Sequence, residues 1–268
     1  MMRLDTKLQN RYEKLFKKNH YPRWAYRQPP SIPFIGNNYS EQAMKCLVYA
    51  SAENLTYLNQ EHVYDINKLK RKQKFNRHRE LSRKPDHFTR IHLEPINNGS
   101  LLIVARYVLA RLGYDKNYSA SPISFLEQIS AGNFGKFSIK ADSNQDYASS
   151  FSHLRESLDY VLSDIEILQP DVLIIPSSIW RFAGIHRKLQ PQLRSGVKII
   201  KIYQTNRQVI GGHIGQALKL MPNFKPASFP FCESWLNKIT DTGINRTEME
   251  KYIKWLNYYF SDLVEVNQ

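Results

Sequence analysis

Cysteine is scarce in this sequence, which contains only Cys46 and Cys232. Two thiols are too few for a disulfide framework, a four-cysteine zinc site or an iron–sulfur cluster. Neither a Cys-x-x-Cys pair nor a His-Glu-x-x-His motif occurs. We therefore predict a protein of a reducing compartment that has no metal site.

Long apolar runs are also missing. The longest, such as residues 101–105 and 172–176, are much shorter than the roughly 18 to 20 residues that a helix needs to cross a bilayer. The first seven residues lack the apolar stretch of a secretion signal. These absences predict a cytoplasmic protein that does not interact with a membrane.

The glycine-rich signatures of phosphate-binding enzymes do not occur. The sequence has no Gly-x-Gly-x-x-Gly and no Gly-x-x-x-x-Gly-Lys-Ser/Thr motif, and the Gly-x-Ser-x-Gly elbow of the α/β-hydrolases is absent too. These gaps disfavour a nucleotide-cofactor enzyme, an NTPase and an α/β-hydrolase. We predict that the protein works without a cofactor.

Positive charge, by contrast, is abundant: 38 Lys and Arg against 24 Asp and Glu give a net charge of +14. Residues 68–84 contain nine Lys and Arg against one acid, Glu80, for a net charge of +8. Basic side chains neutralise phosphates and release counterions, so this segment predicts binding to nucleic acid. A solvated basic loop that serves solubility is the alternative. The predicted DNA-binding residues here are Lys70, Arg71, Lys72, Lys74, Arg77 and Arg79.

A second basic cluster runs from Arg11 to Arg27 and is interleaved with aromatic residues, among them Tyr12, Phe16 and Trp24. Aromatic rings can stack on bases while the cations contact phosphates. We predict a basic, helical N-terminal extension over residues 1–29. Residues 30–268 are predicted to form a single domain with a basic insertion at about 61–95.

Apolar strands and amphipathic helices alternate along the chain. Strands are predicted at 45–50, at the end of 125–131 before Gly132, at 171–175 and at 197–203, and helices at 101–112, 151–168 and 247–263. Near-continuous Val, Ile and Leu strands separated by helices are typical of a parallel sheet covered on both faces. The predicted fold is an α/β three-layer sandwich with a central, mainly parallel four-stranded sheet and helices on both faces.

Open parallel sheets bind ligands at the carboxyl ends of their strands. Glu53 follows the first strand, where it could position or deprotonate a water, although the helix dipole also favours an acid there. Asn133 could read a base edge or cap a helix, and His213 is a candidate catalytic imidazole or an incidental loop residue. The other candidates at these strand ends are Ser51, Asn54, Phe134, Tyr203, Gln204 and Asn206.

The order of these segments resembles the uracil-DNA glycosylase superfamily. Residues 47–54 occupy the place of the loop that positions water in that family, and residues 129–136 that of the strand end whose Asn reads the flipped base. Residues 168–175 resemble the helix end, Pro-Asp and third strand. The chain departs from the family in its first loop, Ser-Ala-Glu-Asn, and lacks the His-Pro-Ser motif. These departures point to a base other than uracil.

The resemblance implies a DNA glycosylase that flips a base out of DNA, hydrolyses its N-glycosidic bond and leaves an abasic site. Glu53, with Asn54 beside it, would hold the attacking water. Asn133 and a donor from residues 204–213 would stabilise the departing base, with Tyr203 or His213 replacing the family histidine. Further DNA contacts would come from Arg207 and from a wedge of Val209 and Ile210.

The resemblance further implies a monomer that acts on a modified base. Hypermodified cytosine in phage DNA, attacked as a defence against the phage, would be such a substrate. A different reading is a non-catalytic α/β protein that binds DNA or RNA through residues 68–84, with Glu53 and Asn133 serving as helix caps. A third is an enzyme that processes nucleotides or nucleosides without contacting a duplex.

Overall fold

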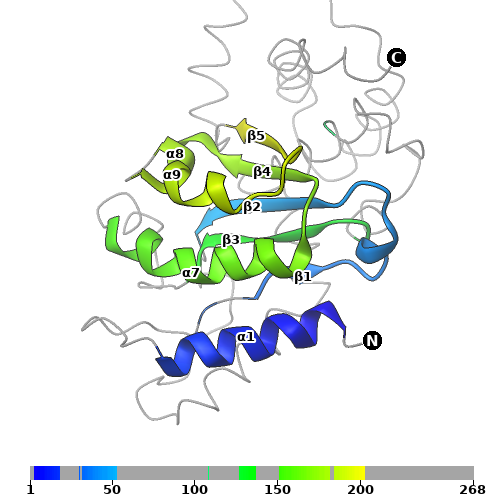
Figure 1. The fold of residues 1–268 in the computed structure, drawn as a ribbon, viewed down its shortest axis with the longest axis horizontal. Helices are drawn as coiled ribbons and strands as arrows, with labels where there is room; N and C mark the ends of the chain where they lie inside the picture. The colour runs from blue at the N-terminus through cyan, green and yellow to red at the C-terminus, as the bar shows by residue number, and fades with distance from the viewer. Residues whose placement is uncertain are drawn as a thin grey trace, which may run out of the picture.

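The computed structural model describes residues 3–18, 30, 32–52, 108, 127–136, 151–181 and 184–202. These residues form a five-stranded mixed sheet with helices packed against it (Figure 1). The strand order across the sheet is β1 (Phe34–Ile35), β3 (Ser130–Gly135), β2 (Cys46–Ala52), β4 (Val172–Pro176) and β5 (Lys198–Ile202). The predicted α/β class is therefore confirmed.

Strands β2, β3, β4 and β5 run parallel to one another, whereas β1 pairs antiparallel with β3. The prediction of four strands is wrong because it misses β1. This strand has two residues, which is too short to produce a period of two in the sequence. The sheet is consequently mixed at the edge formed by β1.

Helix α7 (Phe151–Leu168) has the bounds that its apolar spacing predicts. Its buried face includes Leu154, Leu158, Val161, Ile165 and Leu168. After the helix, Gln169 adopts a positive φ of 47°, and Pro170 cannot continue the helical hydrogen bonding. The chain then enters β4, whose residues are all buried, as expected for a central strand of a covered parallel sheet.

Strand β3 continues through the glycine at which the sequence predicts that it ends. A Cβ atom on Gly132 would lie 3.0 Å from the Cβ and 3.2 Å from the Cα of Pro33. The prediction is wrong because it ends the strand before Gly132, which lies inside β3. Instead, the missing side chain lets the segment leading into β1 approach β3 closely.

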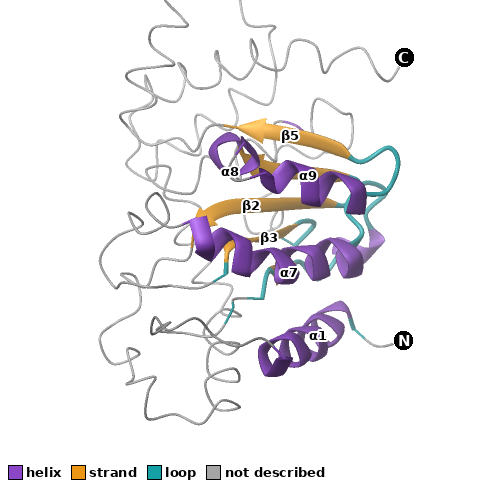
Figure 2. Cartoon of the chain, turned by 60° about the vertical axis from the view of Figure 1, so that its left-hand side comes forward, coloured by secondary structure: helices purple, strands orange, loops and turns teal. Residues whose placement is uncertain are grey.

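The remaining described helices are short, apart from α1 (Leu4–Lys18). Helices α8 (Ser177–Arg181) and α9 (Ile185–Leu189) follow β4 and lie on the same face of the sheet as α7 (Figure 2). Two 3₁₀ turns, η1 (Tyr39–Glu41) and η5 (Gln190–Gln192), complete the described elements. The helices predicted at 101–112 and 247–263 lie outside the described ranges apart from Val108, which is helical. No helix in the described part of the chain is long and apolar enough to span a membrane.

Helix α1 packs against α7 and contributes to the same hydrophobic core (Figure 1). Tyr12 is fully buried, Phe16 is 7% exposed, and the rings of Tyr12 and Tyr160 meet edge to face with their centroids 4.9 Å apart. The prediction that Tyr12 and Phe16 stack on bases is therefore wrong, because both rings are buried and Tyr12 joins α1 to α7 through Tyr160 and Asp164. The other aromatic residues of the cluster, at 21–26, lie outside the described ranges.

Cys46, at the start of β2, is fully buried, and burial raises the pKa of its thiol far above the usual value. Alkylation requires an exposed thiolate. Folding therefore protects Cys46 in two ways, by burying the sulfur and by keeping the thiol protonated. In a Cys232→Ser variant, iodoacetamide at mildly alkaline pH is expected to label Cys46 at least about a thousandfold more slowly in native protein than in urea. Labelling at equal rates in the two conditions would contradict this burial.

Candidate functional site

Strands β2, β3, β4 and β5 all end on one side of the sheet, which we call the carboxyl edge. The chain passes from β2 to β3 in one direction across the sheet, then returns past β2 to β4 and continues to β5. This reversal makes the β2/β4 boundary the topological switch point, where open α/β sheets form a ligand crevice. The end of β2 at Ala52, directly before Glu53, and the junction of β4 with α8 therefore define the candidate site.

Two of the predicted base-reading residues lie on neighbouring strands at this edge. Ser51 is the next-to-last residue of β2, and Asn133 of β3 pairs with Ala50 of β2. Ala52 pairs with Gly135. Asn133 is partly exposed. The sheet thus brings together two segments that are about 80 residues apart in the sequence.

Phe134 belongs to the core beneath the candidate site. Its ring is fully buried and meets the ring of Tyr49 edge to face, with the centroids 5.8 Å apart. Successive strand residues point to opposite faces, so Phe134 and Asn133 project from opposite sides of β3. The base-binding role predicted for Phe134 is not compatible with this burial, because its ring has no exposed face on which a base could stack.

Most of the other predicted site residues lie outside the described ranges, and their roles stay predictions. They are Glu53, Asn54, Tyr203, Gln204, Asn206 and His213 of the pocket, and Lys70, Arg71, Lys72, Lys74, Arg77, Arg79, Arg207, Val209 and Ile210 of the DNA contacts.

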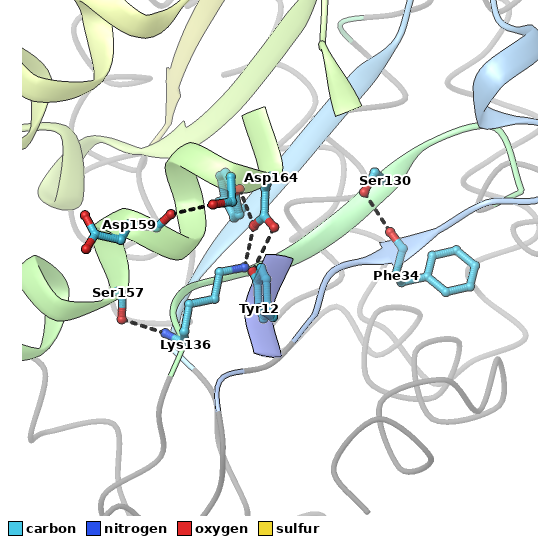
Figure 3. A network of polar contacts seen from close by, with 9 residues as sticks. Tyr12, Phe34, Ser130, Lys136, Ser157, Asp159 and Asp164 are labelled. Carbon is cyan, nitrogen blue, oxygen red and sulfur yellow. Dashed lines mark hydrogen bonds and ion pairs between the residues drawn. The ribbon is translucent and has the colours of Figure 1, made fainter. Parts of the chain in front are cut away.

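A buried polar network lies directly beside the end of β3 (Figure 3). Its centre is Asp164 of α7, whose carboxylate accepts hydrogen bonds from Lys136 Nζ at 2.7 Å, Tyr49 Oη at 2.8 Å and Tyr12 Oη at 2.7 Å. Lys136 also donates its backbone N–H to Ser157 Oγ at 2.9 Å. The Lys136 and Asp164 side chains are both fully buried.

The charges of this network depend on one another. Burial raises the pKa of Asp164, while the Lys136 cation and the hydrogen bonds from Lys136, Tyr12 and Tyr49 act in the opposite direction. Burial, followed by the charge of Asp164, raises the pKa of Tyr12 and Tyr49 well above the usual value. Both tyrosines therefore remain protonated hydrogen-bond donors at neutral pH.

The network connects the elements that flank the candidate site. Tyr12 belongs to α1, Tyr49 to β2 and Asp164 to α7, and Lys136 is the first residue after β3. Since Lys136 and Asp164 are inaccessible, neither can contact a substrate. Their position suits them to hold the ends of β2 and β3 in place.

No motif in the sequence predicts this network, although one signal for it exists. Asp164 and Ser157 occupy positions three or four residues from Leu154, Val161 and Leu168, on the buried face of α7. An acid in the middle of an apolar helical face requires a buried partner. The identity of that partner, Lys136, is not visible in the sequence because it lies in a different segment.

The opposite edge of the sheet is fixed by Asp171, the acid of the Pro-Asp pair before β4. Its carboxylate accepts a hydrogen bond from the backbone N–H of Lys45 at 2.8 Å and pairs with Arg194 at 2.9 Å. Its backbone carbonyl accepts the N–H of Lys198 at 2.9 Å. Asp171 thus aligns the starts of β2, β4 and β5, away from the carboxyl edge.

Comparison of the chain with protein-family models, with curated proteins and with solved structures finds no match.

Proposed function

We propose that the protein is a DNA glycosylase that flips a modified base into a site at the carboxyl edge and hydrolyses its N-glycosidic bond. The observation that carries the proposal is the switch point at β2/β4, because Glu53 comes directly after Ala52, the last residue of β2. Asn133, the predicted base reader, lies one strand away opposite Ala50. A water-positioning acid is thereby expected after the end of β2, and a base-reading amide two residues before the end of the neighbouring strand β3.

The proposed chemistry needs few groups. Cleavage of the glycosidic bond develops positive charge on the sugar and negative charge on the departing base. The Glu53 carboxylate would stabilise the sugar cation and orient the water that attacks the anomeric carbon. The Asn133 amide would donate a hydrogen bond to the base as it acquires charge. One water is consumed, and the products are the free base and an abasic site.

The ion pair of Lys136 and Asp164 supports this proposal because Lys136 directly follows β3, the strand of Asn133, although neither side chain would take part in the reaction. Lys136 follows Asn133 by three residues and is held by Asp164 Oδ2 and Ser157 Oγ. A hydrogen-bonding side chain must be placed within a few tenths of an ångström to discriminate a base. The buried network gives the end of β3 that rigidity.

The experiment that tests the proposal is an assay for abasic sites with purified full-length protein. Duplex and single-stranded oligonucleotides that contain uracil, hydroxymethylcytosine or glucosylated hydroxymethylcytosine are incubated with the protein and then cleaved with alkali. We expect strand cleavage at a modified base and little at uracil. Tight, salt-dependent binding without any base release would instead favour a non-catalytic nucleic-acid-binding protein. The assay uses no added metal or cofactor, and we expect a cytoplasmic monomer.

A further inference from the structure

Helix α1 has two chemically distinct faces. Leu8, Tyr12 and Phe16 recur every four residues and are buried against the rest of the core. A neighbouring face carries four exposed basic residues with a spacing of four, three and four positions. These residues, which we call the α1 basic stripe, are Lys7, Arg11, Lys14 and Lys18.

The stripe is largely uncompensated by acids. Arg11 pairs with Glu166 of α7 at 2.6 Å, but both side chains are well exposed, so the pair is screened by solvent. Within the described part of the chain, Lys7, Lys14 and Lys18 form no ion pair. The stripe is about 16 Å long at 1.5 Å per residue. One strand of B-form DNA presents about five phosphates over that distance.

One end of the stripe lies on the same side of the sheet as the candidate site. In Figure 1, α1 starts beside the marked N-terminus and runs in the direction of the strand arrowheads. The contacts of Arg11 with Glu166 and of Tyr12 with Asp164 and Tyr160 are consistent with an orientation antiparallel to α7, which leads away from the carboxyl edge. Lys14 and Lys18 therefore lie at the end of α1 nearest the carboxyl edge.

We propose that the α1 basic stripe binds the sugar–phosphate backbone of DNA and guides it toward the carboxyl edge. This inference rests on the DNA partner of the proposed function but not on catalysis. An anionic membrane is the less suitable partner, because amphipathic helices bind bilayers through their apolar face. The apolar face of α1 is already buried in the protein, since Leu8 and Tyr12 belong to the core and Phe16 is buried beside them in the sequence of the helix.

Contact through the stripe is independent of base sequence. Its cations can neutralise phosphates, while the aromatic residues of α1 are unavailable for stacking. Phosphate contacts position a protein on DNA without reading sequence. The stripe would thus supply affinity, and selectivity would be left to the residues at the carboxyl edge.

The test compares DNA binding by the full-length protein and by a Lys7→Gln/Lys14→Gln/Lys18→Gln variant. Fluorescence anisotropy is measured with unmodified duplexes of unrelated sequence over about 50 to 200 mM salt. We expect the slope of log affinity against log salt to fall in magnitude by about 2 to 3, equally for all duplexes. Affinity at about 0.1 M salt should fall roughly a hundredfold, while thermal unfolding stays unchanged because the side chains are exposed.

Two control variants separate local contact from overall charge. Lys45→Gln/Lys188→Gln/Lys198→Gln removes the same charge before β2, on α9 and at the start of β5, and should change the slope by less than about 1. Lys7→Arg/Lys14→Arg/Lys18→Arg keeps the charge of α1 and should retain affinity.

The outcomes are distinguishable from those of the glycosylase assay. Unchanged DNA affinity in the triple Lys→Gln variant of α1, or an equal loss in the triple Lys→Gln control, overturns the role of the stripe. Binding to phosphatidylserine vesicles is measured with the same proteins. If the triple Lys→Gln variant of α1 loses vesicle binding but keeps its DNA affinity, the role of the stripe in DNA binding is also overturned. Absence of base release together with the expected salt slopes would overturn catalysis and leave the stripe supported.

Discussion

Replacing Lys136 by methionine is expected to lower the free energy of unfolding by about 3 to 5 kcal/mol. The substitution leaves the Asp164 carboxylate fully buried without its cation, and an unpaired buried charge costs far more than an exposed one. Tyr12 and Tyr49 would still donate to Asp164 but cannot neutralise it. Urea unfolding monitored by tryptophan fluorescence or circular dichroism measures the loss.

Lys188→Met is the matched control, because Lys188 is exposed on α9. Its effect should stay within about 0.5 kcal/mol. A Lys136→Met/Asp164→Asn double variant should lose less than the sum of the two single variants, since no buried charge remains. Equal stability of Lys136→Met and the natural protein would show that the two side chains do not form a buried ion pair.

The loss caused by Lys136→Met is also expected to depend on pH. Burial raises the pKa of Asp164, and the substitution removes the cation that opposes this effect. In the variant, the native state would therefore bind the Asp164 proton more tightly than the unfolded chain, whose Asp pKa is about 3.9. The stability deficit should be smallest below about pH 4 and grow as pH rises through the raised pKa. A pH-independent difference between the two proteins would contradict this origin of the loss.

Replacing Glu53 by glutamine is expected to reduce single-turnover base release by about 10² to 10⁴-fold. Glutamine keeps the size and hydrogen-bonding capacity of the side chain but cannot accept a proton from water or balance the cationic sugar. DNA affinity should be maintained or slightly increased, because a negative charge is removed beside a polyanion. The assay uses the best substrate found for the natural protein, and anisotropy gives the affinity.

Glu41→Gln is the control for this variant, because Glu41 is an exposed acid of η1. It changes the net charge by the same amount and should leave base release unaffected. Full activity of Glu53→Gln would remove Glu53 from the mechanism. Loss of both DNA binding and thermal stability in that variant would indicate a structural role instead.

Local pattern was sufficient for strands β2, β4 and β5 and for α7. The predicted bounds of α7 match the observed helix, because its apolar residues recur at helical spacing and Pro170 stops it. Strands β2, β4 and β5 also follow their Val, Ile and Leu runs closely. These features depend on residues within one segment, so they can be predicted from the sequence.

Features that join distant segments were misread or missed. The predicted strand ends before Gly132, yet Gly132 lies within β3, and Pro33, almost 100 residues earlier, packs where a side chain on this glycine would be. Tyr12 reads as a base-stacking residue within a basic cluster, yet it donates to Asp164 in the core. In each case the deciding contact is with a residue far away in the chain.

By itself, the sequence determined the α/β class, strands β2, β4 and β5 and the concentration of positive charge, because composition and short-range periodicity encode these properties directly. Only the tertiary structure decided which residues meet. It joined Lys136 to Asp164, turned Tyr12 and Phe16 of α1 inward and Lys7, Lys14 and Lys18 outward, and placed Asn133 opposite Ala50 of β2. The physical reason is that burial and side-chain pairing depend on which distant segments the sheet topology brings side by side, and no local sequence pattern specifies that topology.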